Sequence, residues 1–243
     1  MTNYFKKSLY LLVVATVISA NATPTDDFFR AVRSDNASGV RDLINRGFDP
    51  NVKDSNGQTG LLLAMREPSP RVIQVLIESP KTNVEGRNPK DESPLMMAAL
   101  KGQKDLVTQL LKRDADINKP GWAPLHYAAT GGHTDIIKQL LDGNAFIDAQ
   151  SPNGTTPLMM AAMYGSAASV KLLLEEGADV TMKNEQGMTA LDFAQRGNRP
   201  DAIQMLSTVS RVAPAARPAS PGTAFPTAPP SANPQPVPRD GKW

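Results

Sequence analysis

The sequence predicts an all-α solenoid of about six helix-turn-helix units. Five segments share one apolar pattern, and each contains an equivalent leucine: Leu61, Leu95, Leu125, Leu158 and Leu191. These leucines follow one another at intervals of 34, 30, 33 and 33 residues. A second segment with helical apolar spacing follows each first one, as in "DLVTQLL" and "DIIKQLL". A near-constant period of this length, with two amphipathic helices per unit, indicates a repeat protein.

The amino-terminal residues 1–22 have the layout of a secretory signal peptide. Two lysines precede an apolar run over residues 9–18, and Ala20 and Ala22 offer a cleavage site. The alternative is an uncleaved membrane helix. Spanning a bilayer takes about 20 apolar residues, and this run supplies little more than half of that length. We therefore expect export and no membrane contact after cleavage. The periplasm is the expected destination, and release outside the cell is the alternative.

Composition argues against several classes of function. The chain has no cysteine, and removing the expected signal leaves 24 basic and 24 acidic residues. Without cysteine there is no disulfide framework and no thiolate nucleophile, and a balanced charge disfavours a nucleic-acid partner. The paired carboxylates Glu175 and Glu176 lie at a helix end, where solvated charge is the simpler interpretation. The sequence therefore predicts no enzyme, no cofactor and no metal site.

The folded domain is expected over residues 23–210. Its six repeats are placed at approximately 26–54, 55–87, 88–120, 121–150, 151–184 and 185–210. The first and last repeats deviate from the others, as the ends of a solenoid do.

Local residue chemistry supports these helices. Thr156 precedes Pro157, so the threonine can cap a helix whose first position tolerates proline. Gly47 and Gly177 end second helices, where a left-handed residue is favoured, and Asn144 stands at the equivalent position of its own repeat.

The unit "NGTTPLMMAAMYG", followed by "VKLLLEEGADV", resembles the ankyrin repeat family. The resemblance covers residues 26–210, and it implies paired helices with β-hairpin fingers and a concave surface that binds proteins. His126 falls on the histidine of the family's TPLH motif, which implies a structural bridge between a helix start and adjoining backbone. His133 opens a second helix. Both histidines of the chain therefore have framework positions.

One turn is shorter than the family pattern. Only "KPG" separates Asn118 from Trp122, which explains the 30-residue interval. Trp122 is either a binding anchor or a plug that covers the gap left by the shortened turn.

A row of large residues follows the first helices. Leu63, Met97, Tyr127, Met160 and Phe193 occupy equivalent positions. They either form an apolar stripe of the adaptable kind that binds partners or fill space between helices. The candidate partner-binding residues are Trp122, Tyr127, Met97, Leu100, Lys101, Met160, Met163 and Tyr164.

Residues 211–243 contain nine prolines and almost no large apolar residue. Such a segment is expected to be an extended, disordered tail. The functional hypothesis is a non-catalytic module that binds another exported protein. The alternatives are a secreted effector that acts on a host or neighbouring cell and a subunit of an enzyme. The sequence identifies neither the protein partner nor the oligomeric state.

Overall fold

The computed structural model describes residues 23–212, so the predicted signal peptide and nearly all of the predicted tail lie outside the described residues. Residues 23–212 form twelve helices and no strand, which confirms the all-α class. The first helices of the six pairs are α2 (Pro24–Arg33), α4 (Gly60–Arg66), α6 (Pro94–Leu100), α8 (Pro124–Gly131), α10 (Pro157–Met163) and α12 (Ala190–Arg196). The second helices are α3 (Ala37–Asn45), α5 (Pro70–Glu78), α7 (Lys104–Leu111), α9 (Thr134–Asp142), α11 (Ala167–Glu175) and α13 (Pro200–Val212).

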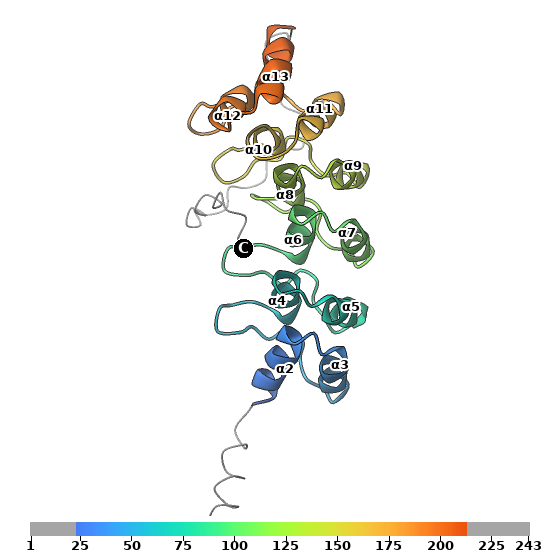
Figure 1. Ribbon diagram of the computed structural model, residues 1–243. Coiled ribbons are helices and arrows are strands. Elements are labelled where there is room, and N and C mark those ends of the chain that lie inside the picture. The colour runs from blue at the N-terminus through green and yellow to red at the C-terminus, as the bar shows by residue number, and fades with distance from the viewer. Residues whose placement is uncertain (1–22, 213–243) are drawn as a thin grey trace, which may run out of the picture. The chain divides into compact units, whose positions relative to one another are not determined.

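The chain divides into two compact units after Asn83. In the first unit, α2 packs on α3 and α4, and α5 packs on α3 and α4. In the second unit, α6, α8, α10 and α12 form one layer, and α7, α9, α11 and α13 form the other (Figure 1). Each unit therefore has two layers of helices with its core between them.

Small residues allow the first helices of the second unit to lie close together. Ala98, Ala128 and Ala161 are at most 1 % exposed. After α10, Gly165 lies directly against the backbone carbonyl of Ala129, and a Cβ there would collide with it. Because neighbouring first helices lie this close together, the space between them is filled at the packing density typical of protein interiors.

The helix ends confirm the expected capping chemistry. The Thr156 hydroxyl accepts the Met159 N–H at 3.3 Å, with Pro157 at the first helical position. Gly47, Gly177 and Asn144 adopt left-handed φ angles of 97°, 96° and 65°.

The fingers are tight turns that project between a second helix and the next first helix. In four of them, one backbone N–H donates to the carbonyl four residues later: Asp54 to Gln58, Asn88 to Glu92, Ser151 to Thr155 and Asn184 to Met188. The described residues contain a single isolated antiparallel bridge, Lys53 with Thr59. The fingers are hairpin-like, but they are too short to form strands.

His126 is a structural residue. Its ring is fully buried and lies between two backbone groups. The Ala123 N–H donates to Nδ1 at 3.1 Å, so the proton is on Nε2, which donates to the Thr155 carbonyl at 3.0 Å. Met96 and Met159 occupy the equivalent position, and their sulfur atoms accept the corresponding N–H at 3.2 and 3.4 Å. The implied bridging role of His126 is confirmed.

His133 belongs to a set of contacts at the start of the second helices. Its Nε2 donates to the carbonyl of Leu100, one repeat earlier, at 3.0 Å. Ser166 donates in the same way to the Gly132 carbonyl, and Arg199 to the Gly165 carbonyl. Side chains at equivalent positions, His133, Ser166 and Arg199, therefore donate to carbonyl groups at the end of the preceding repeat's first helix or just after it, which are the orphan acceptors left at helix ends.

A second set of contacts connects the bases of the fingers. One side-chain oxygen of a repeat accepts a backbone N–H of the next repeat: Asn51 from Asn83, Glu85 from Asp116, Asn118 from Phe146 and Asp148 from Asp179. The two asparagines also donate to carbonyls, Asn51 to Lys81 and Asn118 to Asn144. The carboxylate of Asp148 cannot donate, so the equivalent carbonyl of Gly177 receives no such bond from it.

Replacing His126 with methionine copies the residue of the neighbouring repeats and removes the titrating ring. At pH 7 we expect the variant to be about 1 kcal/mol less stable, because the donor to Thr155 is lost. Burial lowers the pKa of His126 from 6.5 to about 4. The unfolded chain therefore takes up the proton first, and wild-type stability falls as the pH drops from 6.5 to 4. Urea unfolding should show the wild type losing up to about 3 kcal/mol relative to the variant over that range. A constant difference would contradict this.

Asp148→Asn should stabilise the protein at pH 7 by about 1 kcal/mol, since an amide accepts from Asp179 and also donates to Gly177. Burial raises the pKa of Asp148, with a smaller contribution from the charge of Asp179. The cost of the wild-type carboxylate therefore develops as the pH rises above its unfolded value of about 3.9. The gain should shrink at pH 4 in the same unfolding measurement. A gain of equal size at both pH values would show that desolvation of the charge is not its cause.

Candidate functional site

The predicted row on the first helices is largely interior. Leu63, Met97 and Phe193 are each 7 % exposed, so they fill space between helices. Met97 therefore offers little surface to a partner. Tyr127 and Met160 are half-buried, and they are the members of the row that reach the surface.

The surface beside that row is more open. We define the helix-end surface as six half-buried or exposed residues that lie on α6, α8 and α10 or directly after them: Leu100, Lys101, Tyr127, Met160, Met163 and Tyr164. The three helices lie side by side in one layer (Figure 1). Tyr164 is 38 % exposed, and it is one of three large apolar side chains described as exposed. The surface combines thioether, aromatic and aliphatic groups with one lysine, a mixture found in protein interfaces.

Tyr127 connects this surface to a finger. Its hydroxyl donates to Oε1 of Glu92 at 3.4 Å. Burial raises the pKa of Tyr127, and the neighbouring charge of Glu92 raises it further. The phenol therefore remains a neutral donor and positions the base of the finger 88–92.

Trp122 packs against the framework. Its ring lies edge-on to that of His126, with centroids 5.2 Å apart and planes at 71°. The indole is half-buried, which is the arrangement that the plug interpretation requires.

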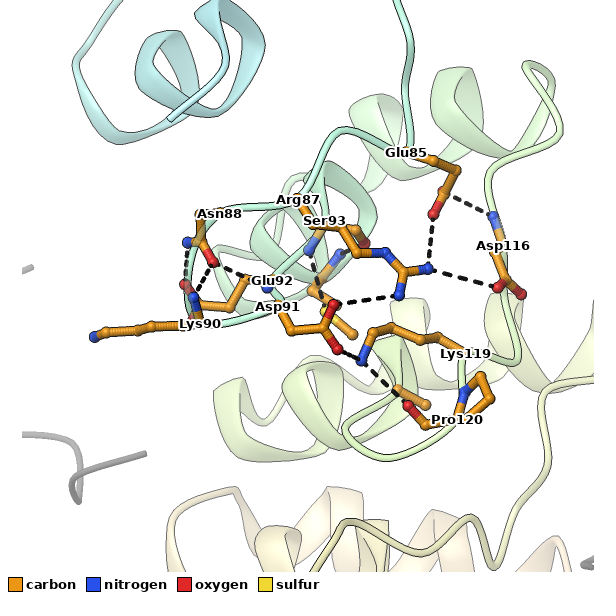
Figure 2. Close-up of polar contacts among 12 residues, drawn as sticks. Glu85, Arg87, Asn88, Lys90, Asp91, Glu92, Ser93, Asp116, Lys119 and Pro120 are labelled. Carbon is orange, nitrogen blue, oxygen red and sulfur yellow. Dashed lines mark hydrogen bonds and ion pairs between the residues drawn. The ribbon is translucent and has the colours of Figure 1, made fainter. Parts of the chain in front are cut away.

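The structure also brings together a charged network that the sequence did not indicate. The finger 88–92 starts at Asn88, whose Oδ1 accepts the N–H groups of Lys90 and Glu92 at 2.9 and 3.0 Å. Beside it, the Asp91 carboxylate pairs with Arg87 at 3.3 Å and with the ammonium of Lys119 (Figure 2). The side chain of Lys119 is only 5 % exposed.

A sequence signal for this network did exist. Asp91 stands where the four other turns before a first helix have glycine: Gly57, Gly121, Gly154 and Gly187. Lys119 lies in the shortened turn at the other end of the same repeat, 88–120. An aspartate at a glycine position beside a deletion indicates that side chains from outside the turn must stabilise it.

Residues 23–212 show neither a cluster of metal ligands nor a membrane-spanning helix. In that range no three His, Cys, Asp or Glu side chains gather closely enough to hold a metal ion. No helix there combines the length and hydropathy needed to cross a bilayer.

Comparisons with known proteins place the chain in a family. The family profile described as "Ankyrin repeats (3 copies)" matches residues 28–120, 95–184 and 125–212, which together exceed half of the chain. Neurogenic locus notch homolog protein 4 of Homo sapiens is 35% identical over 86 residues, 35% of this chain and 4% of that protein. Alpha-latrocrustotoxin-Lt1a of Latrodectus tredecimguttatus is 33% identical over 91 residues, 37% of this chain and 6% of the toxin. The alignments thus span only a small part of these relatives.

Among solved structures, the chain is similar to one from a bacterial complex. This is the predatory endopeptidase Bd0816 of Bdellovibrio bacteriovorus in complex with the immunity protein Bd3460. The match has a TM-score of 0.63 and 27% identity, and it covers 75% of this chain and 97% of the matched chain. The matched chain is a repeat protein. By the family profile and by its helix pairs, the chain belongs to the ankyrin repeat family, whose members are generally non-catalytic protein-interaction modules.

Proposed function

We propose that this protein is a non-catalytic module that binds an exported endopeptidase, in the manner of an immunity protein. Ankyrin repeats bind protein partners. The similar solved structure contains an endopeptidase together with an immunity protein. An identity of 27% over 75% of this chain supports a related role.

Export is part of the proposal. The lysines, apolar run and small residues of positions 1–22 have the order of a signal peptide. Because the chain has no cysteine, no incorrect disulfide can form while it folds in an oxidising compartment. The periplasm is the compartment in which such a protein would meet an exported endopeptidase.

The helix-end surface is the observation on which the binding role depends most. Tyr164 directly follows α10, the helix that contains Met160 and Met163, and all three side chains are half-buried or exposed. Tyrosine and methionine are enriched in the centres of protein interfaces, because they bury large area at modest entropic cost. We propose that this surface covers part of the endopeptidase.

Binding can be measured with purified proteins. The chain from residue 23 onward is immobilised, and exported endopeptidases of the same organism are tested one by one by biolayer interferometry. We expect one of them to bind, and Tyr164→Ala to weaken that binding at least tenfold, about 1.4 kcal/mol or more. Val209→Ala is the matched control, since Val209 is 37 % exposed and lies on α13, away from this surface. It should change affinity less than twofold.

Two results would count against the proposal. If no exported endopeptidase binds, the proposed partner class is wrong. If the two alanine variants weaken binding equally, the helix-end surface is not the contact. Circular dichroism of both variants shows whether the helices are retained.

A further inference from the structure

Phe146 departs from the repeat pattern on the chain between α9 and the turn 151–155. Its N–H donates to Asn118 of the preceding repeat at 2.8 Å, and its side chain is 37 % exposed. At the equivalent position four other repeats have a polar residue: Asp49, Asn83, Asp116 and Asp179. The framework bond uses only the backbone of Phe146, so it does not explain the ring. A residue that breaks the pattern without serving the framework is a candidate binding contact.

Carboxylates lie on both sides of this ring. We define the second-helix edge as the chain that follows α7, α9 and α11, with Asp116, Phe146, Asp148 and Asp179 as its members. Asp148 accepts the Asp179 N–H at 3.0 Å, and within residues 23–212 no lysine or arginine pairs with its carboxylate. Burial raises the pKa of Asp148, so a nearby cation would stabilise its charged form. The edge therefore suits a ligand that combines an apolar group with a positive charge.

The chain itself contains a segment with this chemistry. Residues 213–243 hold nine prolines, and Phe225 lies between Arg217 and the pair Pro226 and Pro229. Prolines three residues apart share one face in the expected polyproline geometry, which has three residues per turn. Segments of this kind dock on exposed aromatic side chains.

The charges of the two parts are complementary. Residues 84–210 contain 12 basic and 15 acidic residues, which gives −3. Residues 211–243 contain four basic residues and one acidic residue, which gives +3. Attraction between them therefore favours a tail that lies along the second unit.

The tail is long enough to reach Phe146. Helix α13 packs on α11, and α11 packs on α9, so the three follow one another in one layer (Figure 1). Two helix spacings of about 8–10 Å each, added to about 20 Å for the 13-residue length of α13, put Phe146 within about 40 Å of Val212. Phe225 follows Val212 by 13 residues, which span about 40 Å in polyproline geometry.

We propose that the segment 213–229 folds back along the second-helix edge, where Phe225 and its neighbouring prolines pack on Phe146 and Arg217 lies against Asp179 and Asp148. The occupant of this surface is thus the chain's own tail. The proposal goes beyond the proposed function and does not depend on it. The helix-end surface belongs to the first helices, so it stays accessible to a partner while the tail is docked.

The first test measures paramagnetic broadening in the exported chain, residues 23–243. Because the chain has no cysteine, Thr223→Cys provides one site for a nitroxide label two residues before Phe225. In the ¹⁵N-labelled protein we expect the amide signals of residues 144–149 to weaken about twofold or more relative to the reduced label. The signals of residues 160–164, on the helix-end surface, should keep their intensity.

Two aspartate variants provide the comparison. Phe146→Asp copies the residue of the neighbouring repeats, so it keeps the framework and should restore the signals of residues 144–149. Val209→Asp is the matched control, because Val209 is also 37 % exposed, and it should leave the broadening unchanged. Arg217→Glu should weaken the broadening, since it places a like charge beside Asp148, and salt at about 0.5 M should act in the same direction.

Three results would overturn the proposal. Broadening of residues 160–164 in place of 144–149 would put the tail on the helix-end surface. Equal broadening in wild type and Phe146→Asp would show that the ring is not the contact. Equal broadening when the nitroxide is on a separate, ¹⁴N chain mixed with the ¹⁵N chain would make a second copy the source of the tail.

The second test needs no label. Removing residues 213–243 should speed hydrogen exchange of the Phe146 and Asp179 amides about threefold or more, because the tail no longer covers them. The amides of α4 and α5, in the first unit, are the internal control and should exchange as before. Unchanged exchange of both edge amides in the folded, shortened chain would contradict docking on this edge.

Discussion

Each repeat of this protein can bury its apolar face only against the next repeat, so the structure depends on close approach between neighbouring first helices. In the second unit that approach is set by residues with little or no side chain. Ala98, Ala128 and Ala161 lie in the contact, and Gly165 meets the Ala129 carbonyl. Because the helices are this close, the larger residues of the row, Met97 among them, are covered by their neighbours. Within residues 84–212, accessible surface beside this row therefore lies at the helix ends and the fingers.

Close approach also determines how polar backbone groups are satisfied. Helix ends and finger bases leave N–H and C=O groups without partners inside their own repeat. Side chains from the adjacent repeat supply the missing partners, as His133 does for Leu100 and Asn118 for Phe146. The identity of the side chain varies, but each bond joins it to a backbone group of the adjacent repeat. His133 therefore has a structural role, because its ring is used to satisfy a backbone carbonyl.

The fold was predictable because it is specified by a pattern that repeats. The 33-residue spacing, the Thr-Pro helix starts and the glycines after the second helices each predict the same elements, and agreement between such signals is what specifies a structure. The assignment of His126 as a bridge was also correct, because that role depends on its place in the repeat.

The exposure of the row of large residues on the first helices was not predictable. Met97 and Met160 have the same residue type at equivalent positions, yet the first is buried and the second is half-buried. Which of them is covered depends on the side chains of the neighbouring repeats, and this information lies outside the periodic pattern.

The charged network shows the same limit more sharply. Asp91 and Lys119 come from opposite ends of the repeat 88–120, and Arg87 precedes that repeat, so the repeat pattern does not indicate that they meet. The shortened turn is the cause that connects them. A full-length finger would carry its own turn, whereas the three missing residues leave Lys119 next to the preceding finger. The buried ammonium of Lys119 is paired there with the carboxylate of Asp91, and it also donates to the Pro120 carbonyl. The deletion, the aspartate at a glycine position and the buried lysine thus belong to one structural change. A change that departs from the repeat at three positions together is a better guide to a specific surface than any residue that the repeat requires.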